Sequence, residues 1–467
     1  MDSLHNQLKS ALQGGAKKTA DLLHKLNISQ SKFSRLIASV GDSVISIGKA
    51  RSTMYACTRD FRGLGSKFPI FRVTSQGGAV QTYGELSVLV AGQFAIELHQ
   101  YKDRQLFDGL PYFLQDMRPQ GFIGRSFTNK NRDLRLPERI ADWSDDDALY
   151  ALVCRGEDCI GDIIVGNESL AYFYQSLAAP IIPIHVNERE TRYVELAEES
   201  MAGTSAGSSA GGEQPKFTTS IIRNDHDVIE SVIVKFSPAD DTPVSTRWRD
   251  LLIAEHIALE SIRKTEFAAA KSEVLFAGNR IFLEVARFDR HGAHGRSGVI
   301  SIGAIDDEYF GMRDTWLKAA IRLVDQKMIS STEAKALRYQ AVFGQLIGNT
   351  DQHFGNASLI NNHNGNFPYR LAPAYDVLPM LYAPVNGEIV PRKLAPPMPT
   401  SETLDIWISA MKNASAYWMQ LASDIRLSDN FRNIALENIK ALDTLSPIAR
   451  NIAKVSGADG MKASAEY

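Results

Sequence analysis

Residues 349–356, NTDQHFGN, are the stretch from which the rest of the chain can be interpreted. It places a carboxylate, Asp351, five positions before an amide, Asn356. A carboxylate can accept the proton of a hydroxyl group, and an amide oxygen can bind Mg²⁺ without adding negative charge beside a phosphate. The spacing D-x-x-x-x-N therefore indicates a site for phosphoryl transfer. His353, between the two, is interpreted as a residue that braces the loop, not as a metal ligand.

A further carboxylate follows at the place where such a site needs its main metal ligand. ASLIN, residues 357–361, and FPYRL, residues 367–371, flank a turn-rich NHNGN and predict a β-hairpin. PAYDVLP then supplies Asp376, although without the Phe-Gly pair that follows this aspartate in protein kinases. The order predicts Asp351 as catalytic base, and Asn356 with Asp376 as ligands of Mg²⁺.

A run rich in glycine and serine precedes two apolar segments in the middle of the chain. In GTSAGSSAGGEQPK, residues 203–216, small side chains would let backbone N–H groups approach phosphate oxygens. Phe217 follows Lys216 where a P-loop has Ser or Thr, so the run lacks the Mg²⁺ ligand of that motif. By itself such a run is more often a flexible linker. The candidate ATP contacts in this run are Gly211 and Gly212, with Gln214 and Lys216 in support.

SVIVKF, residues 231–236, places Lys235 near the end of an apolar β segment shortly after that run. Protein kinases use this order for the lysine that binds the α- and β-phosphates of ATP. The helical segment RDLLIAEHIALESIRK offers Glu255 as its ion-pair partner, with Glu260 as a rival. A lysine in such a place is commonly a plain surface residue, so the neighbouring motifs decide the interpretation.

RIFLEVARFDR, residues 280–290, predicts a strand that leads out of the β-rich part of the site. Its backbone would meet the adenine of ATP, and an aromatic ring would pack nearby. The candidate contacts are Glu284, Ala286 and Phe288. Arg287, Asp289 and Arg290 fit a plain ion-pair cluster equally well.

The first sixty residues are basic, with nine Lys and Arg against four Asp and Glu. Residues 19–39 carry apolar side chains at the spacing of two short amphipathic helices, with Ser29 as N-cap of the second and Gly41 beyond its end. Residues 43–59 then predict two strands around a basic tip. Together these features predict a winged helix-turn-helix that binds DNA, while the alternative is a pair of hairpins used for packing or dimerisation.

The candidate DNA contacts are the polar outward positions of the second helix and the basic tip of the hairpin. They are Gln30, Ser31, Lys32, Ser34, Arg35, Lys49 and Arg51. Such side chains can meet phosphates and base edges.

The bulk composition fits a globular protein with more than one structural unit, since 467 residues exceed what one core usually supports. A net charge of −3 gives no general attraction to nucleic acid or anionic lipid. The three cysteines lack the number and spacing of a disulfide scaffold or zinc site. The first residues do not show the basic and then apolar pattern of a signal peptide, and no apolar run approaches eighteen residues. We therefore expect a cytoplasmic protein that is not attached to a membrane.

Several segments predict secondary structure directly. From about Phe68 the sequence is β-rich and punctuated by glycine, and DDDALYALVCR, residues 145–155, then predicts a helix. Longer helices are predicted over residues 249–264, 315–324, 331–348 and 427–445.

Taken in order, these motifs resemble the HipA-like toxin kinases, bacterial serine/threonine kinases of toxin–antitoxin systems. The likeness starts at about residue 68 and rests on SAGGEQPK, VARFDR, NTDQHFGN and AYDVLP. It implies ATP and Mg²⁺ as cofactors, Lys235 on the ATP phosphates, and a protein substrate, translation-related in known members. It also implies autophosphorylation at Ser209, with Ser208 and Ser205 as alternative acceptors. A phosphoserine there would repel the ATP phosphates and switch the kinase off.

The N-terminus departs from that family, in which DNA binding belongs to a separate antitoxin partner. A fused winged helix-turn-helix resembles the YjjJ/HipH-like branch, and it leaves open whether a separate antitoxin exists. We therefore expect an α+β, bilobal HipA/protein-kinase-like fold preceded by a small winged helix-turn-helix. Its expected parts are residues 1–62 for DNA binding, 63–186 as a β-rich subdomain, 187–290 as the kinase small lobe, and 291–467 as the mainly helical large lobe.

Two other functions fit parts of the pattern. The first is a DNA-binding transcription regulator whose kinase-like region only senses nucleotide, and the complete set Lys235, Asp351, Asn356 and Asp376 argues against it. The second is a small-molecule phosphotransferase, because related folds use the same acidic residues on sugars or antibiotics.

Overall fold

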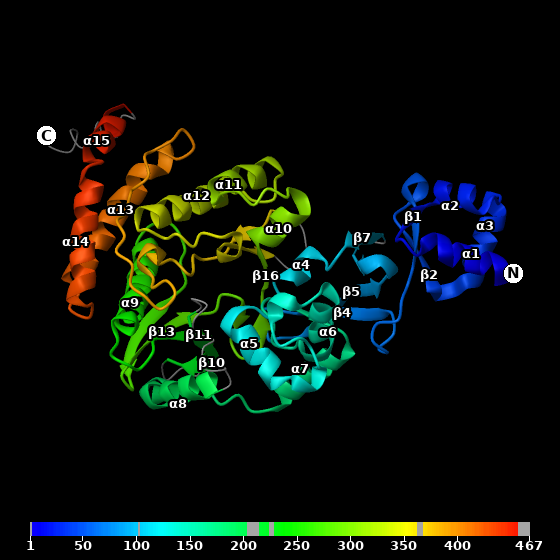
Figure 1. The fold of residues 1–467 in the computed structure, drawn as a ribbon, viewed down its shortest axis with the longest axis horizontal. Coiled ribbons are helices and arrows are strands. Elements are labelled where there is room, and N and C mark those ends of the chain that lie inside the picture. Colours follow the sequence, from blue (N-terminus) through cyan, green and yellow to red (C-terminus); the bar gives the residue numbers. More distant parts are fainter. Residues whose placement is uncertain (1, 101–102, 203–213, 224–227, 362–367, 456–467) are drawn as a thin grey trace. The chain divides into compact units, whose positions relative to one another are not determined.

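The computed structural model describes residues 2–100, 103–202, 214–223, 228–361 and 368–455 (Figure 1). The chain divides into two compact units. Unit 1 comprises Met1–Gln120, Asn131–Pro180 and His294–Arg296, and unit 2 comprises Gly121–Lys130, Ile181–Ala293 and Ser297–Tyr467. Across the described ranges, every helix is too short or too polar to cross a membrane.

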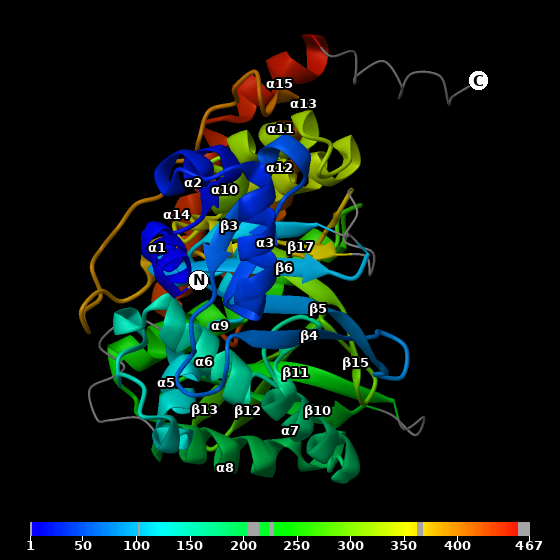
Figure 2. The ribbon, with the colours of Figure 1, turned by 90° about the vertical axis from the view of Figure 1, so that its right-hand side faces the viewer.

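Unit 1 begins with three helices and a small sheet (Figures 1 and 2). The second and third helices and the hairpin match the elements expected from the sequence. Ser29 caps α3 by accepting a hydrogen bond from the N–H of Lys32 at 3.4 Å, and Gly41 follows the helix with a φ of 57°. The elements are α1 (Asp2–Leu12), β1 (Lys17–Lys18), α2 (Thr19–Leu26), α3 (Gln30–Val40), β2 (Val44–Ile47) and β3 (Met54–Cys57), with strand order β1-β3-β2.

Helix α1 is an addition to what the sequence suggested. Its Leu8 and Leu12 are fully buried and pack with Leu22 of α2 and Phe33 of α3 in one hydrophobic cluster. The helix pair therefore has a third helix as its support, and the winged helix-turn-helix stays a prediction for these residues.

The rest of unit 1 is the β-rich region expected after Phe68. Its five strands are antiparallel in the order β7-β6-β5-β4-β8. The helix expected over residues 145–155 is present, with Ser144 and Asp147 forming a capping box at its start. The elements are β4 (Lys67–Val73), β5 (Val80–Val88), β6 (Gln93–Leu98), β7 (Arg104–Asp108), α4 (Tyr112–Gln115), α6 (Asp145–Arg155), β8 (Ile163–Val165), α7 (Asn167–Ala178) and, near the end, β15 (Gly295–Arg296).

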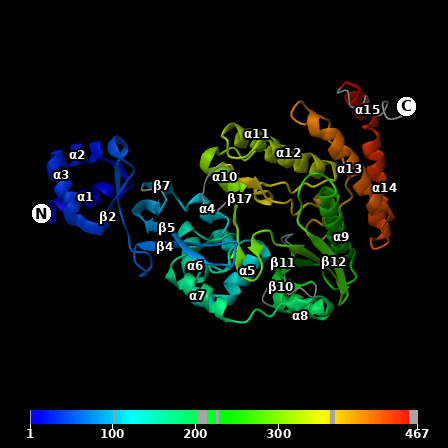
Figure 3. The ribbon, with the colours of Figure 1, turned by 180° about the vertical axis from the view of Figure 1, so that it is seen from behind.

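Unit 2 contains a second five-stranded sheet, in the order β12-β13-β11-β10-β9, with α8 and α9 on its two faces (Figures 1 and 3). Side chains alternate between the faces along each strand. Val234 and Phe282 pack with Tyr193 of α8, whereas Leu283 packs with Leu251 of α9. The elements are α5 (Gly121–Lys130), β9 (Ile184–His185), α8 (Arg189–Ala202), β10 (Lys216–Ile222), β11 (Ile229–Phe236), α9 (Pro243–Arg263), β12 (Ser272–Ala277) and β13 (Arg280–Ala286).

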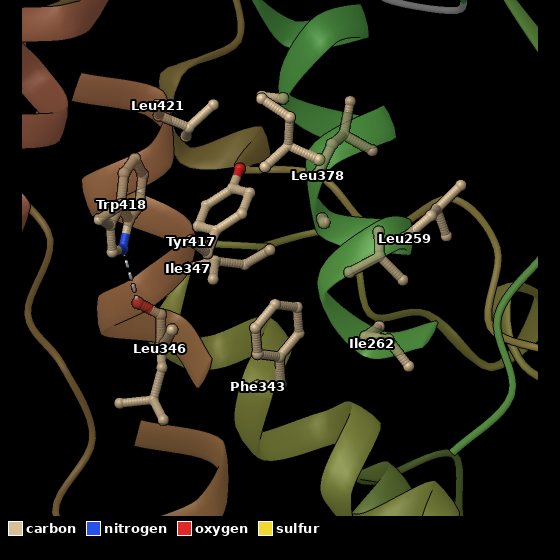
Figure 4. Close-up of a cluster of buried hydrophobic side chains, with 14 of the residues drawn as sticks. Leu259, Ile262, Phe343, Leu346, Ile347, Leu378, Tyr417, Trp418 and Leu421 are labelled. Atoms are coloured by element: carbon tan, nitrogen blue, oxygen red, sulfur yellow. Dashed lines mark hydrogen bonds between the residues drawn. The ribbon is translucent and has the colours of Figure 1, made fainter. Parts of the chain in front are cut away.

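The remainder of unit 2 is mainly helical, and the predicted helices and the predicted hairpin β17–β18 are confirmed. One hydrophobic cluster joins α9 to α12 and α13, and Figure 4 shows Leu259, Phe343 and Tyr417 meeting in it. The elements are β14 (Arg290–His291), β16 (Gly298–Ser301), α10 (Ile302–Tyr309), α11 (Trp316–Asp325), α12 (Ser331–Leu346), β17 (Ser358–Asn361), β18 (Arg370–Leu371), α13 (Leu404–Ser423), α14 (Asp429–Asp443) and α15 (Ser446–Val455).

The fold class is therefore α+β, as expected. The shared core of α9 with α12 and α13 fixes the second sheet to the helices of unit 2. The four-part division of the chain stays a prediction, because both of its first two parts lie mostly within unit 1.

Candidate active site

Lys235 lies at the centre of a buried ion cluster in unit 2. Its ammonium donates hydrogen bonds to both carboxylate oxygens of Glu255, at 2.6 and 2.8 Å, and also to the carboxylate of Asp376. Glu255 is fully buried on α9, and Lys235 itself is 6% exposed. Glu260, the rival partner on the same helix, pairs instead with Arg263 at 2.8 Å. The structure thus brings together three of the residues singled out in the sequence. Two of them, Lys235 and Asp376, are 141 positions apart in the chain.

The alternation of β11 explains why Lys235 meets α9. Lys235 faces the same side of the sheet as Leu283, its partner on β13, and that side is covered by α9. On the other neighbouring strand its partner is Lys216, the first residue of β10. Directly opposed residues of antiparallel strands share a face, so both lysines lie on the α9 side.

The charges of the cluster shift the pKa values of its members. Burial would raise the pKa of Asp376, but the charges of Lys235 and Lys216 outweigh it and lower that pKa to about 2. Burial raises the pKa of Glu255, against the opposing charge of Lys235. The pKa of Lys235 is raised, because the two carboxylates overcome the effect of its burial. Asp376 is therefore ionised at neutral pH and its charge is held by lysines.

The backbone at Asp376 adopts the left-handed conformation, with a φ of 52°. This region is unfavourable for most residues other than glycine, and it is seen where surrounding contacts impose it. Here the conformation accompanies a carboxylate directed at Lys235. Such a strained residue is a candidate for function.

The loop with Asp351 and Asn356 is organised by its own hydrogen bonds. The N–H of Asp351 donates to the side-chain oxygen of Asn349 at 3.0 Å, and the side-chain amide of Asn356 donates to the carbonyl of Asp351 at 2.9 Å. The carboxylate of Asp351 is about half exposed and lies 3.8 Å from the ring of His353. The other ring nitrogen of His353 accepts the N–H of Gly355 at 3.1 Å, which is the bracing role expected for this histidine.

Tyr375 connects this loop to the Asp376 segment, and the sequence reasoning missed it. Its hydroxyl donates to the carbonyl of Gly355 at 2.9 Å and lies 2.6 Å from the hydroxyl of Ser358. These two contacts bring the loop and the Asp376 segment close together. The signal available in the sequence was the position of Tyr375, directly before the metal-ligand candidate.

The oxygen atoms of Asp376 and Asn356 suit a hard cation that takes its other ligands from water and phosphate. Asp376 offers a carboxylate, and Asn356 offers its amide oxygen because its amide nitrogen is used within the loop. Within the described residues, no group of three His, Cys, Asp or Glu side chains could hold a metal by itself. Mg²⁺ usually takes one or two protein oxygens and completes its shell with waters and phosphates, so these residues fit it.

The segment expected at the adenine has its side chains engaged elsewhere in unit 2. Glu284 is fully buried on the α8 face, where it accepts hydrogen bonds from Arg189 at 3.0 Å, Tyr193 at 2.5 Å and Arg223. Its side chain thus lies on the opposite face of the sheet from Lys235, so the adenine contact expected of this segment stays a prediction for its backbone. The N–H of Ala286 is already bonded to the carbonyl of Lys271 at 2.8 Å.

Phe288 packs its ring on that of Tyr375, with centroids 5.5 Å apart. Beyond it, Arg287 and Arg290 both bond to the buried carboxylate of Asp289, at 2.8 and 2.6 Å. The ion-pair interpretation of these three residues is therefore the one the structure supports.

The remaining kinase candidates belong to the glycine-rich run, of which the structure describes only the part from residue 214 onward. Gly211, Gly212, Ser205, Ser208 and Ser209 lie outside the described residues. Gln214 is described and half-buried, and its side-chain nitrogen has no hydrogen-bond partner among the described atoms.

The candidate DNA contacts of unit 1 are of two kinds. The five on α3, namely Gln30, Ser31, Lys32, Ser34 and Arg35, are all exposed. Lys49 is instead paired with Asp103 at 2.6 Å, and the N–H of Gly48 donates to the carbonyl of Arg104 at 3.3 Å. The tip of the hairpin is thus attached to the start of β7. The side chain of Arg51 lies outside the described set.

Comparison with known proteins places the chain in a family. Residues 64–174 match the middle domain of YjjJ-like toxins, and residues 208–446 match the HipA-like C-terminal domain. The chain is 35% identical to Toxin YjjJ of Escherichia coli (strain K12) over 458 residues, which cover 97% of this chain and 100% of that protein.

Two solved structures are more distant. A HipA chain from the Shewanella oneidensis MR-1 complex of HipA, HipB and operator DNA has a TM-score of 0.47 and 15% identity, covering 82% of this chain and 99% of that one. The Helicobacter pylori proinflammatory kinase CtkA has a TM-score of 0.36 and 12% identity, covering 51% and 95%. The sequence matches, which span nearly the whole chain, decide the assignment: the chain belongs to the HipA-like toxin family, in its YjjJ-like branch.

Proposed function

We propose that this protein is an ATP- and Mg²⁺-dependent protein serine/threonine kinase of the HipA toxin type. The observation that carries the proposal is the buried cluster of Lys235, Glu255 and Asp376. A loop with Asp351 and Asn356 at kinase spacing is tied to the same segment by Tyr375. Membership of a toxin family with a HipA-like domain supports the same class of activity.

Each side chain has a separate task in this proposal. Lys235 binds the α- and β-phosphates while Glu255 holds its ammonium in place. Asp376 and the amide oxygen of Asn356 hold Mg²⁺. Asp351 accepts the proton of the acceptor hydroxyl, and its half-exposed carboxylate is open to a substrate. ATP with Mg²⁺, when bound, supplies the phosphoryl group that is transferred.

Lys216 adds a second positive charge on the same face of the sheet. Its charge already acts on both carboxyl groups: it helps to lower the pKa of Asp376, and it offsets part of the rise that burial causes in the pKa of Glu255. Two neighbouring lysines suit a polyphosphate better than one, because the attraction in a partly buried site is weakly screened. We assign Lys216 to the phosphates together with Lys235.

The glycine-rich run would carry the regulatory site. Ser209 is our proposed autophosphorylation site, with Ser208 and Ser205 as alternatives, and Gly211 and Gly212 as backbone contacts of ATP. A phosphorylated serine among these residues would place about two negative charges where ATP phosphates bind, and it would therefore weaken ATP binding.

Phosphoproteomics of cells that express the wild-type protein or the Asp351→Asn variant tests the proposal. Serine and threonine phosphorylation of specific proteins should rise only with the wild type. Asp325→Asn, an exposed aspartate at the end of α11, is the matched control and should behave as wild type. Equal phosphoproteomes in all three strains, together with phosphorylation of small hydroxyl compounds by the purified protein, would favour the small-molecule phosphotransferase instead.

We further propose that residues 1–62 bind DNA. The observation that favours this second function is the exposed polar face of α3 in a domain with the element order of a winged helix-turn-helix. Arg35 has no ion-pair partner among the described residues, so its charge is available to a phosphate.

A further inference from the structure

The segment 302–316, which comprises α10 and the chain up to the first residue of α11, contacts the catalytic loop and the residue after it at three points. We call it the α10–α11 corner. The N–H of Ile302 donates to the carbonyl of Ala357 at 2.9 Å, and the indole N–H of Trp316 donates to the carbonyl of His353 at 3.2 Å. The guanidinium of Arg313 lies 5.9 Å from the centre of the Phe354 ring. The corner residues that make these contacts, Ile302, Arg313 and Trp316, lie outside the motifs that carry the kinase proposal.

The corner is itself rigidly held by Asp306, which is 2% exposed. Its carboxylate accepts the N–H groups of Met312 and Arg313 at 2.7 and 2.8 Å, and it also pairs with Arg322 at 2.8 Å. A carboxylate with several such donors fixes a turn more firmly than neutral contacts do. The corner can therefore serve as a fixed support for the loop beside it.

Trp316 makes the one side-chain hydrogen bond among the three contacts. It is 3% exposed, and it is the first residue of α11, whose N-cap Thr315 accepts the N–H of Lys318. The His353 carbonyl that it binds also accepts the N–H of Asn356 at 3.0 Å. Trp316 therefore acts on the peptide group that sets the turn between Asp351 and Asn356.

We propose that Trp316 is a positioning residue of the catalytic loop. It touches neither nucleotide nor substrate in this assignment, which rests on the proposed kinase function. Its hydrogen bond fixes the His353 peptide, and through it the direction of the Asp351 carboxylate and the Asn356 amide. Loss of one such bond should affect the chemical step more than ATP binding, because Lys235, Lys216 and Glu255 belong to other elements.

The chain offers matched controls for this test. Trp407 and Trp418 are also buried, and each donates its indole N–H to a backbone carbonyl, that of Pro397 at 3.2 Å and that of Leu346 at 3.3 Å. Replacement by Phe removes the same kind of hydrogen bond in all three places and keeps an aromatic ring. Only Trp316 binds a carbonyl of the catalytic loop.

Steady-state kinetics should separate the three variants. Trp316→Phe should lower kcat by roughly two- to tenfold, the effect of one hydrogen bond, with KM for ATP changed less than about twofold. Trp407→Phe and Trp418→Phe should keep the wild-type kcat, with a similar lowering of Tm in all three. A kcat of Trp316→Phe equal to those of the controls, or an effect confined to KM, would overturn the proposal.

Hydrogen exchange gives a readout that does not require kinase activity. In Trp316→Phe the amides of residues 353–358 should exchange faster than in the wild type, and in Trp407→Phe they should not. Unchanged exchange in Trp316→Phe would overturn the positioning role. Faster exchange in a protein that transfers no phosphate would contradict the kinase proposal and leave the support of the loop by Trp316 established.

Discussion

Lys235 carries a buried ammonium group, and two carboxylate partners compensate its charge. Removal of one partner from a buried ion pair leaves a poorly compensated charge, which destabilises a protein more than the pair stabilises it. Glu255 holds Lys235 through both carboxylate oxygens and is fully buried, whereas Asp376 is partly exposed. We therefore expect Glu255 to be the structural partner and Asp376 the one that is shared with a cation.

The first prediction concerns Glu255→Gln, which keeps the shape of the side chain and removes its charge. The free energy of unfolding should fall by about 1–3 kcal/mol, and KM for ATP should rise on the order of tenfold, because Lys235 loses its fixed position. Urea unfolding and initial-rate kinetics measure the two effects. Glu260→Gln, on the solvent side of the same helix, should change neither, and equal effects of the two substitutions would refute the assigned pair.

The second prediction follows from the lowered pKa of Asp376. A carboxylate with a pKa below its unfolded value stabilises the folded state above the unfolded pKa, and this stabilisation is lost as the pH falls through the folded value. The window for Asp376 lies between its usual value of 3.8 and about 2. The difference in free energy of unfolding between wild type and Asp376→Asn should therefore be constant above about pH 5 and shrink below pH 4.

Urea unfolding from pH 7 to pH 3 checks this prediction. Asp325→Asn, at an exposed position outside the ion cluster, is again the control variant and is measured over the same pH range. A wild-type advantage over Asp376→Asn that grows in acid would show that the carboxylate is not held by the lysines.

Among single elements, α3 and the β2–β3 hairpin make different predictions for DNA binding. Arg35→Ala should weaken binding and reduce the slope of log affinity against log salt by about one. Lys49→Ala should have a smaller effect, because this ammonium is already paired with Asp103. Asp103→Asn should strengthen binding by releasing Lys49.

Fluorescence anisotropy of the full chain with labelled duplex DNA, over a series of salt concentrations, measures these changes. Binding that is absent or independent of salt would remove the DNA-binding proposal. A loss in Lys49→Ala equal to that in Arg35→Ala would show that the Asp103 pair opens on DNA.

The helices and strands themselves were largely predictable from the sequence. The side of the sheet to which each side chain points was not. The strand with Lys235 and the helix with Glu255 follow from apolar patterning, although the helix begins at Pro243 and not at residue 249 as expected. In contrast, Ile281, Phe282 and Leu283 form a continuous apolar run that hides which face each residue takes. Glu284 was therefore named as a nucleotide contact without a face for its side chain, and register with β11 and β12 turns that side chain toward α8.

At the level of the whole molecule, the candidate site residues were found in short local motifs. The residues that hold them in place lie far away in the sequence. Trp316 and His353 are 37 positions apart, and Lys235 and Asp376 are 141 apart. Spacing in a sequence identifies a residue type at the right distance along the chain, but tertiary packing decides which carbonyl or carboxylate it meets. This is why Asp351, Asn356 and Asp376 could be proposed from the sequence and Trp316 could not, whereas Tyr375 was marked only by its position directly before Asp376.

Unit 1 likewise depends on contacts between distant segments. Arg59 pairs with Asp146 at 2.5 Å, and Arg62 with Asp147 at 2.5 Å, so the end of the N-terminal domain is fixed to the first turn of α6. The ring of Tyr150 lies 4.7 Å from the guanidinium of Arg62. The N-terminal domain is thus joined to the β-rich region by several ion pairs, which a division at residue 62 does not reveal.

The central claim is that Asp351 serves a phosphotransferase site, and intact-mass measurement tests it most directly. Purified wild-type protein incubated with Mg²⁺ and ATP should gain phosphate, mapped by fragmentation to residues 204–209, while Asp351→Asn stays at its starting mass. Addition of EDTA should abolish the gain in the wild type. A wild-type protein that gains no phosphate, or an Asp351→Asn variant that gains as much, would contradict the account.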